Sequence, residues 1–323
     1  MNYINTQGVP LSLAVFLATD NYDHNPDPYT ISATSLLKPL RQLVLGARAQ
    51  NQDVGVDLLG LLNSRMGNAI HDGIERAWTG NYQDALAALR YPKDVIERVV
   101  INPTNPTEDQ IPVYLEQRSS RTVGKWTITG KFDFVGDGRV EDFKSTSVFT
   151  AIHGTKDDDY IWQGSIYRWL NPTLITQDTM AIQWIFTDWL RAKALADKSY
   201  PQNRHQEKVF LLKSVQETDV FIRRKLELIE KYWDAPEDTI PECTKEELWQ
   251  AEPTYKYYKD PTKTARSTKN FDNKQEAYKR LRDDHGVGIV KEVPGTAKAC
   301  AYCPGFSECT QKDRLISTGA LVL

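Results

Sequence analysis

The chain has 323 residues, of which 40% are hydrophobic and eight are tryptophan, which is enough apolar material for a sizeable buried core. Lysine and arginine number 40 against 43 acidic residues, so the net charge of -3 excludes a uniformly basic nucleic-acid-binding protein. Any contact with nucleic acid must therefore be local, and a bound cation would add positive charge that this count omits.

An apolar stretch lies close to the N-terminus, at residues 9–17. No lysine or arginine precedes it, as the charged start of a secretory signal would require, and no apolar run approaches the length needed to cross a bilayer. We therefore expect residues 9–17 to form a buried element, followed by a polar loop at residues 20–28. Both observations favour a cytoplasmic protein that has no membrane partner.

The first third of the chain is expected to be mainly helical. Leucines recur at helical spacing after residue 35, and Ser32 and Thr34 are candidate N-caps. The expected helices are at residues 31–50, 54–78, 82–89 and 92–100, and a loop at residues 102–110 follows them.

A β-sheet is expected to begin at residues 113–118, and a hairpin of two further strands continues it. Residues 123–135 are rich in β-forming side chains, and the Gly-Asp-Gly sequence at residues 136–138 tolerates the positive φ of a tight turn. The second strand of the hairpin is expected at residues 139–146.

The hairpin places charged side chains where they can meet. Asp142 and Lys144 project to the same side of their strand, and antiparallel pairing can bring Asp133 close to Asp142. Two carboxylates can hold Mg²⁺ or Mn²⁺ with positions open for water and a phosphate, while the lysine orients the water or helps to deprotonate it. The pattern indicates a phosphodiester hydrolase site. The alternative is a surface hairpin whose charges are solvated or paired.

The segment after the hairpin, residues 158–170, has apolar positions at helical spacing, which predicts an amphipathic helix packed on the sheet. Gln163 and Tyr167 are four residues apart, so they lie one above the other on one face of this helix. A polar pair at that spacing is by itself a weak signal.

Three motifs together resemble the signature of RecB-like nucleases in the PD-(D/E)XK superfamily. They are Gly130-x-x-Asp133, Asp142-x-Lys144 and Gln163-x-x-x-Tyr167, in the order strand, strand and helix. The resemblance implies an α/β (α+β) fold with a restriction-endonuclease-like core, in which helices flank a central mixed sheet. It also implies catalytic roles for Asp133, Asp142, Lys144, Gln163 and Tyr167.

The same family carries a histidine on an upstream helix, within a G-x-x-x-H segment followed by an acidic residue. Gly67 and His71 match this segment here, and Glu75 follows one turn later. The resemblance implies that His71 joins Asp133 and Asp142 as a ligand of Mg²⁺ or Mn²⁺, and imidazole suits Mn²⁺ better. Outside that resemblance, His71 would be a structural or exposed histidine. Glu75 either orients the imidazole ring or forms a surface ion pair.

The chain beyond residue 170 predicts the rest of the sheet. Two strands are expected at residues 180–187 and 208–213, with a polar excursion at residues 189–198 between them. An amphipathic helix is expected at residues 218–233. The core would thus be a mixed sheet flanked by helices.

Residues 255–269 combine five basic side chains and three tyrosines with one acid. They lack apolar periodicity and contain Pro261, which predicts an exposed loop. Basic side chains can neutralise phosphates and tyrosine rings can stack on unpaired bases, so the loop either contacts DNA or is simply solvated. The candidate DNA-binding residues are Lys256, Lys259, Lys263, Arg266 and Lys269.

The four cysteines are Cys243, Cys300, Cys303 and Cys309, and the last three form a C-x2-C-x5-C cluster. In a cytoplasmic protein this spacing indicates metal ligands rather than disulfides, and four thiolates could hold an iron–sulfur cluster or zinc. The spacing resembles that of the iron–sulfur members of the RecB-like family, including those of CRISPR adaptation. The resemblance implies a [4Fe–4S] cluster, with Zn²⁺ as the alternative.

The family pattern also has one cysteine far upstream, and no cysteine precedes Cys243 here. Either Cys243 supplies the fourth ligand or the site has three. Thr244 and Glu247 form a capping-box sequence, which predicts a helix that starts just after Cys243.

The sequence therefore predicts a metal-dependent DNA nuclease, most simply an exonuclease that acts in DNA recombination or repair, with a phage as one setting. The alternative is a catalytically inactive DNA-binding or assembly module that retains the fold. The expected partners are DNA and a recombination partner such as a single-strand annealing protein, in the cytoplasm of the cell or of a phage host. We expect one integrated domain with three parts. They are a mostly helical part with His71 at residues 1–110, the nuclease core at residues 111–235, and a segment with the basic loop and the cysteines at residues 236–323.

Overall fold

The structure is a computed structural model, and it describes residues 2–20, 25, 27–49 and 55–322. The chain divides into two compact units. The first comprises Met1–Leu37 and Asp53–Leu226, and the second comprises Lys38–Gln52 and Glu227–Leu323. No helix in the described part of the chain is both long enough and apolar enough to cross a membrane.

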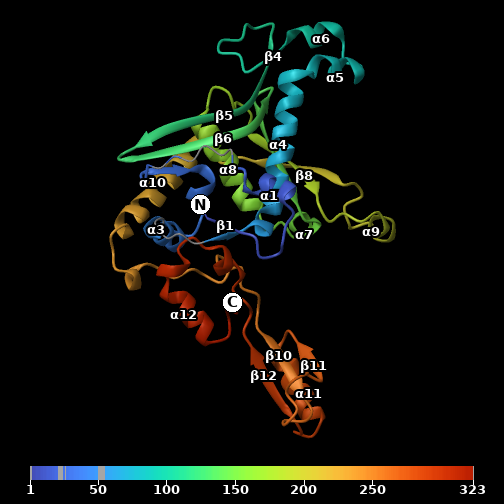
Figure 1. Cartoon of the computed structure of the whole chain (residues 1–323), viewed down its shortest axis with the longest axis vertical. Helices are drawn as coiled ribbons and strands as arrows, with labels where there is room; N and C mark the ends of the chain where they lie inside the picture. Colours follow the sequence, from blue (N-terminus) through green and yellow to red (C-terminus); the bar gives the residue numbers. More distant parts are fainter. Residues whose placement is uncertain (1, 21–24, 26, 50–54, 323) are drawn as a thin grey trace. The chain divides into compact units, whose positions relative to one another are not determined.

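A curled mixed sheet lies at the centre of the first unit (Figure 1), which confirms the expected α/β (α+β) architecture. Three of its strand pairs are parallel, namely β4 with β5, β7 with β8 and β2 with β6, and the remaining pairs are antiparallel. In spatial order the strands are β4 (Val99–Ile101), β5 (Ile111–Val123), β6 (Trp126–Gly136), β7 (Arg139–Thr146), β8 (Thr179–Phe186) and β9 (His205–Leu211), and β2 (Thr30–Ser32) pairs with β6.

Helices flank this sheet. The helices described in this unit are α1 (Leu11–Ala18), α2 (Ala33–Leu36), α4 (Leu62–Gly80), α5 (Tyr82–Ala88), α6 (Lys93–Arg98), α7 (Val148–His153), α8 (Asp157–Leu170) and α9 (Arg191–Ala196), and α10 (Val215–Tyr232) begins in it. Helix α8 packs on β5, β6, β8 and β9, and α4 packs on β7. Trp126, Phe132, Trp169 and Trp184 are almost fully buried in this unit. Burial of such large rings supplies much of the free energy that holds α8 to the sheet.

The predicted hairpin of β6 and β7 forms largely as expected. β7 covers the predicted residues, and Asp137 and Gly138 take positive φ values of 50° and 71° in the turn before it. The first predicted strand, at residues 123–135, is wrong at its start. Val123 ends β5, and Gly124, with a φ of 61°, begins a tight turn into β6. A side-chain pattern alone did not reveal this additional hairpin, because β-formers lie on both sides of the turn.

The N-terminal region departs more from expectation. Helix α1 forms, but its apolar residues are mostly exposed, since Leu17 is its one buried residue. The expected buried element is therefore wrong. Within residues 31–49 the chain forms β2, α2 and α3 (Leu40–Arg48) rather than one helix, because Pro39 interrupts it. Ser32 caps α2 as expected, since its hydroxyl accepts a hydrogen bond from the Ser35 N–H.

A two-stranded parallel pair, β1 (Tyr3–Ile4) with β3 (Val56–Asp57), and a short 3₁₀ helix, η1 (Leu58–Leu61), precede α4. The helix predicted from residue 54 therefore begins only at Leu62. Residues 21–24 and 26 of the predicted polar loop, together with Gln50 and Val54, lie outside the described residues.

The second unit holds a small antiparallel sheet in the order β11 (Lys269–Phe271), β10 (Thr254–Tyr258) and β12 (Ile289–Val293). Its core includes Tyr257, Phe271 and Ala277. The other elements of this unit are α3, η2 (Glu237–Thr239), α11 (Lys274–Asp283), η3 (Lys298–Tyr302), η4 (Phe306–Glu308) and α12 (Thr310–Ser317).

The loop predicted at residues 255–269 is wrong at its two ends, because β10 runs to Tyr258 and β11 begins at Lys269, and only residues 259–268 form a loop. Tyr257 is 0% exposed and Tyr258 is 6% exposed, so neither ring is available to stack on a base. The capping box after Cys243 does form, since the Thr244 N–H donates to Glu247 and the Glu247 N–H donates to the Thr244 hydroxyl. It closes a turn, however, and no helix follows it.

Candidate functional site: a carboxylate–histidine cavity on strand β6

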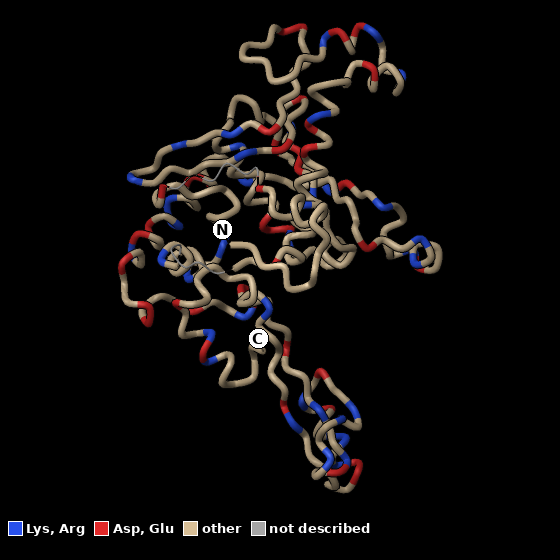
Figure 2. Tube along the Cα trace, in the orientation of Figure 1, with Lys and Arg blue, Asp and Glu red and all other residues tan. Residues whose placement is uncertain are grey.

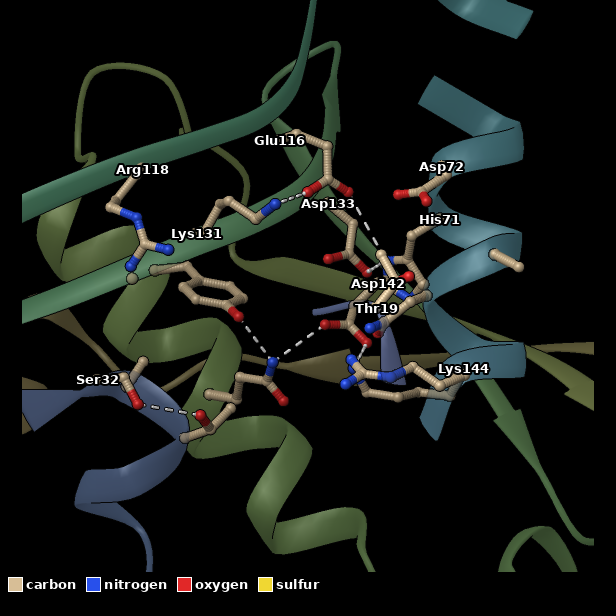
Figure 3. A pocket seen from close by; sticks show the side chains of 18 of the residues that line it. Thr19, Ser32, His71, Asp72, Glu116, Arg118, Lys131, Asp133, Asp142 and Lys144 are labelled. Carbon is tan, nitrogen blue, oxygen red and sulfur yellow. Dashed lines mark hydrogen bonds and ion pairs between the residues drawn. The ribbon is translucent and has the colours of Figure 1, made fainter. Parts of the chain in front are cut away.

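A cavity of about 560 Å³ opens where strand β6 changes partners. One edge of β6 pairs with β2 at residues 127–129 and with β7 at residues 134–136, and the cavity lies at the positions between them. Six of the residues predicted from the sequence line this one cavity: His71, Asp133, Asp142, Lys144, Gln163 and Tyr167. The fold thus brings together side chains from α4, β6, β7 and α8 (Figure 3).

The backbone of Phe143 explains why β7 leaves β6 at this point. Its N–H donates to Oδ2 of Asp133 at 2.9 Å, and its carbonyl lies 2.9 Å from Nε2 of His71. Both backbone polar groups of this one residue therefore bond to side chains of the cavity rather than to β6. This arrangement positions the carboxylate and the imidazole relative to each other.

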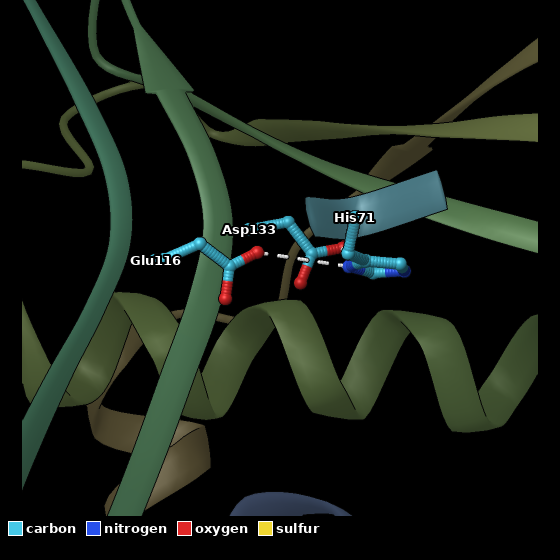
Figure 4. A group of neighbouring side chains, drawn as sticks. All are labelled: His71, Glu116 and Asp133. Carbon is cyan, nitrogen blue, oxygen red and sulfur yellow. Dashed lines mark ion pairs between the residues drawn. The ribbon is translucent and has the colours of Figure 1, made fainter. Parts of the chain in front are cut away.

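The contact with the Phe143 carbonyl also identifies which nitrogen of His71 faces the cavity. A carbonyl only accepts hydrogen bonds, so Nε2 carries a proton and Nδ1 is the atom that can bind a cation. Nδ1 lies 3.4 Å from Oδ2 of Asp133 and 3.7 Å from Oε1 of Glu116 (Figure 4). An imidazole lone pair that faced two carboxylates would be repelled, so the site requires a proton or a metal ion between them.

Glu116 is the site residue that sequence reasoning missed. It lies on β5 directly across from Asp133, because Leu115 pairs with Phe134 and Gln117 pairs with Phe132. Its φ is 52°, an unfavourable value for a residue with a Cβ, and such strain tends to occur at functional sites. Among the described residues, the group His71, Glu116 and Asp133 offers ligand atoms that all lie within 4.8 Å of one another.

Asp142 and Lys144 form the second part of the site. Lys144 contacts Oδ2 of Asp142 as an ion pair, which confirms that the two side chains share one face of β7. Oδ1 of Asp142 accepts a hydrogen bond of 3.1 Å from Gln163, and Gln163 also donates to the Tyr167 hydroxyl at 2.7 Å. The fully buried Oδ2 of Asp142 has no partner with hydrogen-bonding geometry, although the Lys144 ammonium lies beside it.

Burial and charge shift the proton equilibria of this cluster. Burial, together with the charge of Asp133, raises the pKa of Asp142 to about 6. Burial opposes ionisation of Asp133 as well, but the His71 hydrogen bond and the Lys144 charge outweigh it and hold the pKa of Asp133 below its usual value. Burial likewise acts to lower the pKa of His71, yet its bonds to Asp133 and Glu116 raise that pKa to about 10.

Two glycines of the predicted motifs allow helices to approach the sheet closely. A Cβ on Gly130 would lie 2.8 Å from Cδ1 of Leu170 and 3.0 Å from Cδ1 of Tyr167, so only glycine lets α8 reach β6 here. A Cβ on Gly67 would lie 3.2 Å from the Ser145 hydroxyl oxygen, so α4 is also close to β7. The glycines therefore belong to the geometry that positions Tyr167 and His71.

Glu75 lies one turn beyond His71 on α4 but does not line the cavity. The opposite end of the cavity is basic instead. Arg118 of β5 and Lys131 of β6 are cross-strand partners that line it, and Lys131 forms an ion pair with Glu116.

The four cysteines converge in the second unit, where all of them line one small pocket. Burial raises the pKa of Cys243 to about 12, with smaller contributions from Glu247, Cys303 and Cys309, and burial also raises the pKa values of Cys300 and Cys303. Such thiols remain protonated unless a metal ion binds them. Because all four cysteines line this pocket, Cys243 lies beside the three C-terminal cysteines.

A buried arginine borders this thiol pocket. The Arg41 side chain is 3% exposed, and its Nε donates to Sγ of Cys309 at 3.2 Å. The same guanidinium donates to the carbonyl of Ile240 at 2.7 Å and forms an ion pair with Glu237.

The predicted DNA-binding residues lie on and between two strands of the second unit. Lys256 is on β10 and Lys269 is on β11, while Lys259, Lys263 and Arg266 lie between them. Figure 2 shows that lysine and arginine residues gather over this sheet and α11, with acidic residues among them. Lys263 pairs with Asp260 at 3.5 Å, so part of this charge is balanced locally.

The chain matches no family model and no curated protein. Among solved structures, it is similar to the crystal structure of SSO0001, with 17% identity over 69% of this chain and 85% of that chain, and a TM-score of 0.39. It is also similar to a phage-related exonuclease from Haemophilus somnus 129PT, with 20% identity over 36% of this chain and 58% of that chain, and a TM-score of 0.25.

Proposed function

We propose that the chain is a metal-dependent deoxyribonuclease. The observation that carries the proposal is one cavity that combines three converging ligand side chains, His71, Glu116 and Asp133, with the ion pair of Asp142 and Lys144. Carboxylate oxygen atoms are suitable ligands for both Mg²⁺ and Mn²⁺, and the imidazole nitrogen favours Mn²⁺. A lysine beside such a group can orient the attacking water and stabilise charge on the phosphate oxygens, which suits phosphodiester hydrolysis.

The residues fit a divalent cation. Nδ1 of His71 faces two carboxylates, and the buried Oδ2 of Asp142 lacks a partner with hydrogen-bonding geometry. The electron pairs of His71 Nδ1, Glu116 and Asp133 converge in a partly buried space, where a cation would balance them, whereas Oδ2 of Asp142 is already balanced by the Lys144 ammonium. When bound, the ion would polarise the phosphate and lower the pKa of a water molecule.

The remaining residues would act directly on water and phosphate. The Lys144 ammonium lies at the cavity wall, so it would orient the attacking water and stabilise the charge that develops on the phosphate oxygens. Asp142 fixes this ammonium through its ion pair, and Gln163 in turn fixes Asp142. Tyr167 accepts a hydrogen bond from Gln163, so its own hydroxyl proton can be directed to a phosphate oxygen.

The DNA substrate and the exonuclease mode extend this proposal. Both follow from the resemblance of the three motifs to RecB-like nucleases, together with roles in recombination or repair and a phage setting. The cavity volume of about 560 Å³ supports a substrate that enters as a strand rather than as a whole duplex.

We expect Asp142→Asn to lower Mn²⁺-dependent DNA cleavage by roughly 100-fold or more, because the variant loses the charge that holds Lys144 in place. Asp137→Asn, at the exposed turn before β7, is the matched control and should cleave like the wild type. Cleavage of end-labelled linear DNA and of a closed plasmid, with and without EDTA, measures the activity and separates exonuclease from endonuclease.

Equal cleavage by Asp142→Asn and wild type would contradict the proposed site, provided that circular dichroism shows both to be folded. DNA binding by the wild type without any metal-dependent cleavage would instead support the catalytically inactive binding module.

We also propose a structural metal site in the second unit, held by Cys243, Cys300, Cys303 and Cys309. A [4Fe–4S] cluster is the first candidate and Zn²⁺ the alternative. Either group would link Cys243 to the C-terminal segment, since all four cysteines line the same pocket.

A further inference from the structure

Strands β5 and β6 carry two neighbouring pairs of charged residues with opposite sign. Glu116 and Asp133 face each other across the strands, and Arg118 pairs with Lys131 two residues further along. Side chains two residues apart on a strand project to the same face, so all four can reach the cavity. Figure 3 shows Arg118 and Lys131 beside Glu116 and Asp133 around the same space.

The two pairs differ in what they can bind. The acidic pair lies at the His71 end and belongs to the candidate metal site. The basic pair is displaced from it by two residues on each strand, which is about 7 Å. That displacement is comparable to the separation of neighbouring phosphates along a nucleic-acid strand.

The basic pair is accessible to a ligand. Arg118 is exposed, and the Lys131 side chain is 38% exposed although it contacts Glu116. The Glu116 side chain is 12% exposed, so Lys131 connects the buried acidic pair to the open part of the cavity. A guanidinium fork suits the paired oxygens of a phosphate, and the lysine adds a second positive charge beside it.

We propose that Arg118, assisted by Lys131, binds the phosphate adjacent to the scissile one. This subsite would set the position of the substrate strand, so that the next phosphate lies over His71, Asp133 and Lys144. The inference rests on the proposed nuclease function, since it defines the scissile phosphate by the metal site. It assigns a binding role to two residues whose identity none of the sequence motifs specifies.

The test uses short DNA strands with one neutral methylphosphonate, placed on either side of the cleaved bond. The proteins are the wild type, Arg118→Ala, Arg118→Lys and the control Arg191→Ala, which removes an exposed arginine of α9 that does not line the cavity. We measure kcat and KM for each strand, and binding of each strand by fluorescence anisotropy in EDTA.

One of the two methylphosphonates should lower wild-type kcat/KM by roughly 10- to 100-fold, the effect expected from the loss of one charged hydrogen bond. Arg118→Ala should show a similar loss on unmodified DNA and little further loss on that modified strand, because the two changes remove the same contact. Arg118→Lys should recover part of the loss, and Arg191→Ala should behave like the wild type.

Independent, additive losses from Arg118→Ala and from both methylphosphonates would overturn the proposal, as would equal behaviour of Arg118→Ala and Arg191→Ala. Binding in EDTA separates this result from failure of the nuclease function. Wild type that binds DNA without cleaving it would refute the nuclease, while the anisotropy series would still decide whether Arg118 contacts the phosphate. Wild type that neither binds nor cleaves DNA would refute both.

Discussion

The hydrogen bond of His71 to a backbone carbonyl leaves its other ring nitrogen available to the proposed metal ion. The Phe143 carbonyl holds a proton on Nε2, and this leaves Nδ1 toward Asp133 and Glu116. In the metal-free protein the two carboxylates raise the pKa of His71 to about 10, despite the opposing effect of burial. At neutral pH, Nδ1 therefore also carries a proton, which the proposed metal ion would have to displace.

We predict that Mn²⁺ affinity rises with pH between about 6 and 9, because deprotonation of His71 becomes easier as the pH approaches its raised pKa. Isothermal titration calorimetry in buffers of different ionisation enthalpy should show release of about one proton per ion. His71→Gln should bind Mn²⁺ roughly 10- to 100-fold more weakly, and it should release fewer protons per bound ion than the wild type. Proton release that is unchanged in His71→Gln would show that another group is displaced.

Glu116 could not have been found by periodicity or by motif. It occupies an ordinary position in a strand, and its role depends on an unusual φ of 52° and on the register that places it across from Asp133. The residues that were found, such as Asp142, Lys144 and Gln163, sit in local patterns of two to four residues whose relative orientation follows from the strand or helix itself. Ligands that converge only through tertiary structure leave no such local pattern.

Helix α8 brings Gln163 and Tyr167 to the cavity because its contact with β6 is unusually close. Gly130 provides the space for Leu170 and Tyr167, and Gly164 provides the corresponding space for Met180 of β8. Because glycine at both contacts lets the helix axis approach the sheet, these two residues determine how close Gln163 and Tyr167 lie to β6.

We predict that Gly130→Ala lowers the free energy of unfolding by about 1–3 kcal/mol, because the added methyl group would overlap Leu170 and Tyr167. Chemical denaturation measures the change. Gly73→Ala is the matched control, since a Cβ at this site within α4 meets no atom within 4 Å, and it should stabilise the protein by up to about 1 kcal/mol. If both variants lost stability equally, close packing at Gly130 would not be the cause.

The elements that could be predicted are those whose own residues specify both their type and their ends. The turn before β7 has residues that tolerate positive φ, and α8 has both helical periodicity and acidic residues in its first turn. The predicted loop at residues 255–269 is too long, because the segment lacks apolar periodicity and contains Pro261, whereas Lys256 and Tyr257 lie on β10. Tyr257 packs with Phe271 and Ala277, and this tertiary burial overrode the local pattern.

At the scale of the whole molecule, the chain builds two units from interleaved segments. Residues 38–52 leave the first unit and join residues 227–323, where Val44 and Leu45 pack with Ile240. Within this unit α3 contacts the cysteine segment closely, because a Cβ on Gly305 would lie only 2.6 Å from Cβ of Leu45. Arg41, also on α3, donates to Sγ of Cys309. The proposed cysteine site thus depends on a helix from the beginning of the chain.

We predict that Cys243→Ser lowers bound metal and the Tm of the protein, because it removes one of four proposed ligands. Iron and zinc analysis, with the visible absorption of protein purified without oxygen, measures the loss and identifies the metal. Ser307→Ala, in the segment between Cys303 and Cys309, is the control and should keep the full metal content. Unaltered metal content in Cys243→Ser would leave a three-cysteine site or none.

Because the second unit combines early and late segments of the chain, its parts are synthesised at different times. Helix α3 leaves the ribosome early, yet Ile240 and Cys309, against which it packs, are translated roughly 10–40 s and 13–53 s later at ordinary rates of elongation. During that interval the apolar side of α3 and the Arg41 guanidinium have none of these native neighbours. A nascent chain halted before residue 240 would therefore expose this helix, and chaperone capture at α3 would be the signature of incomplete translation.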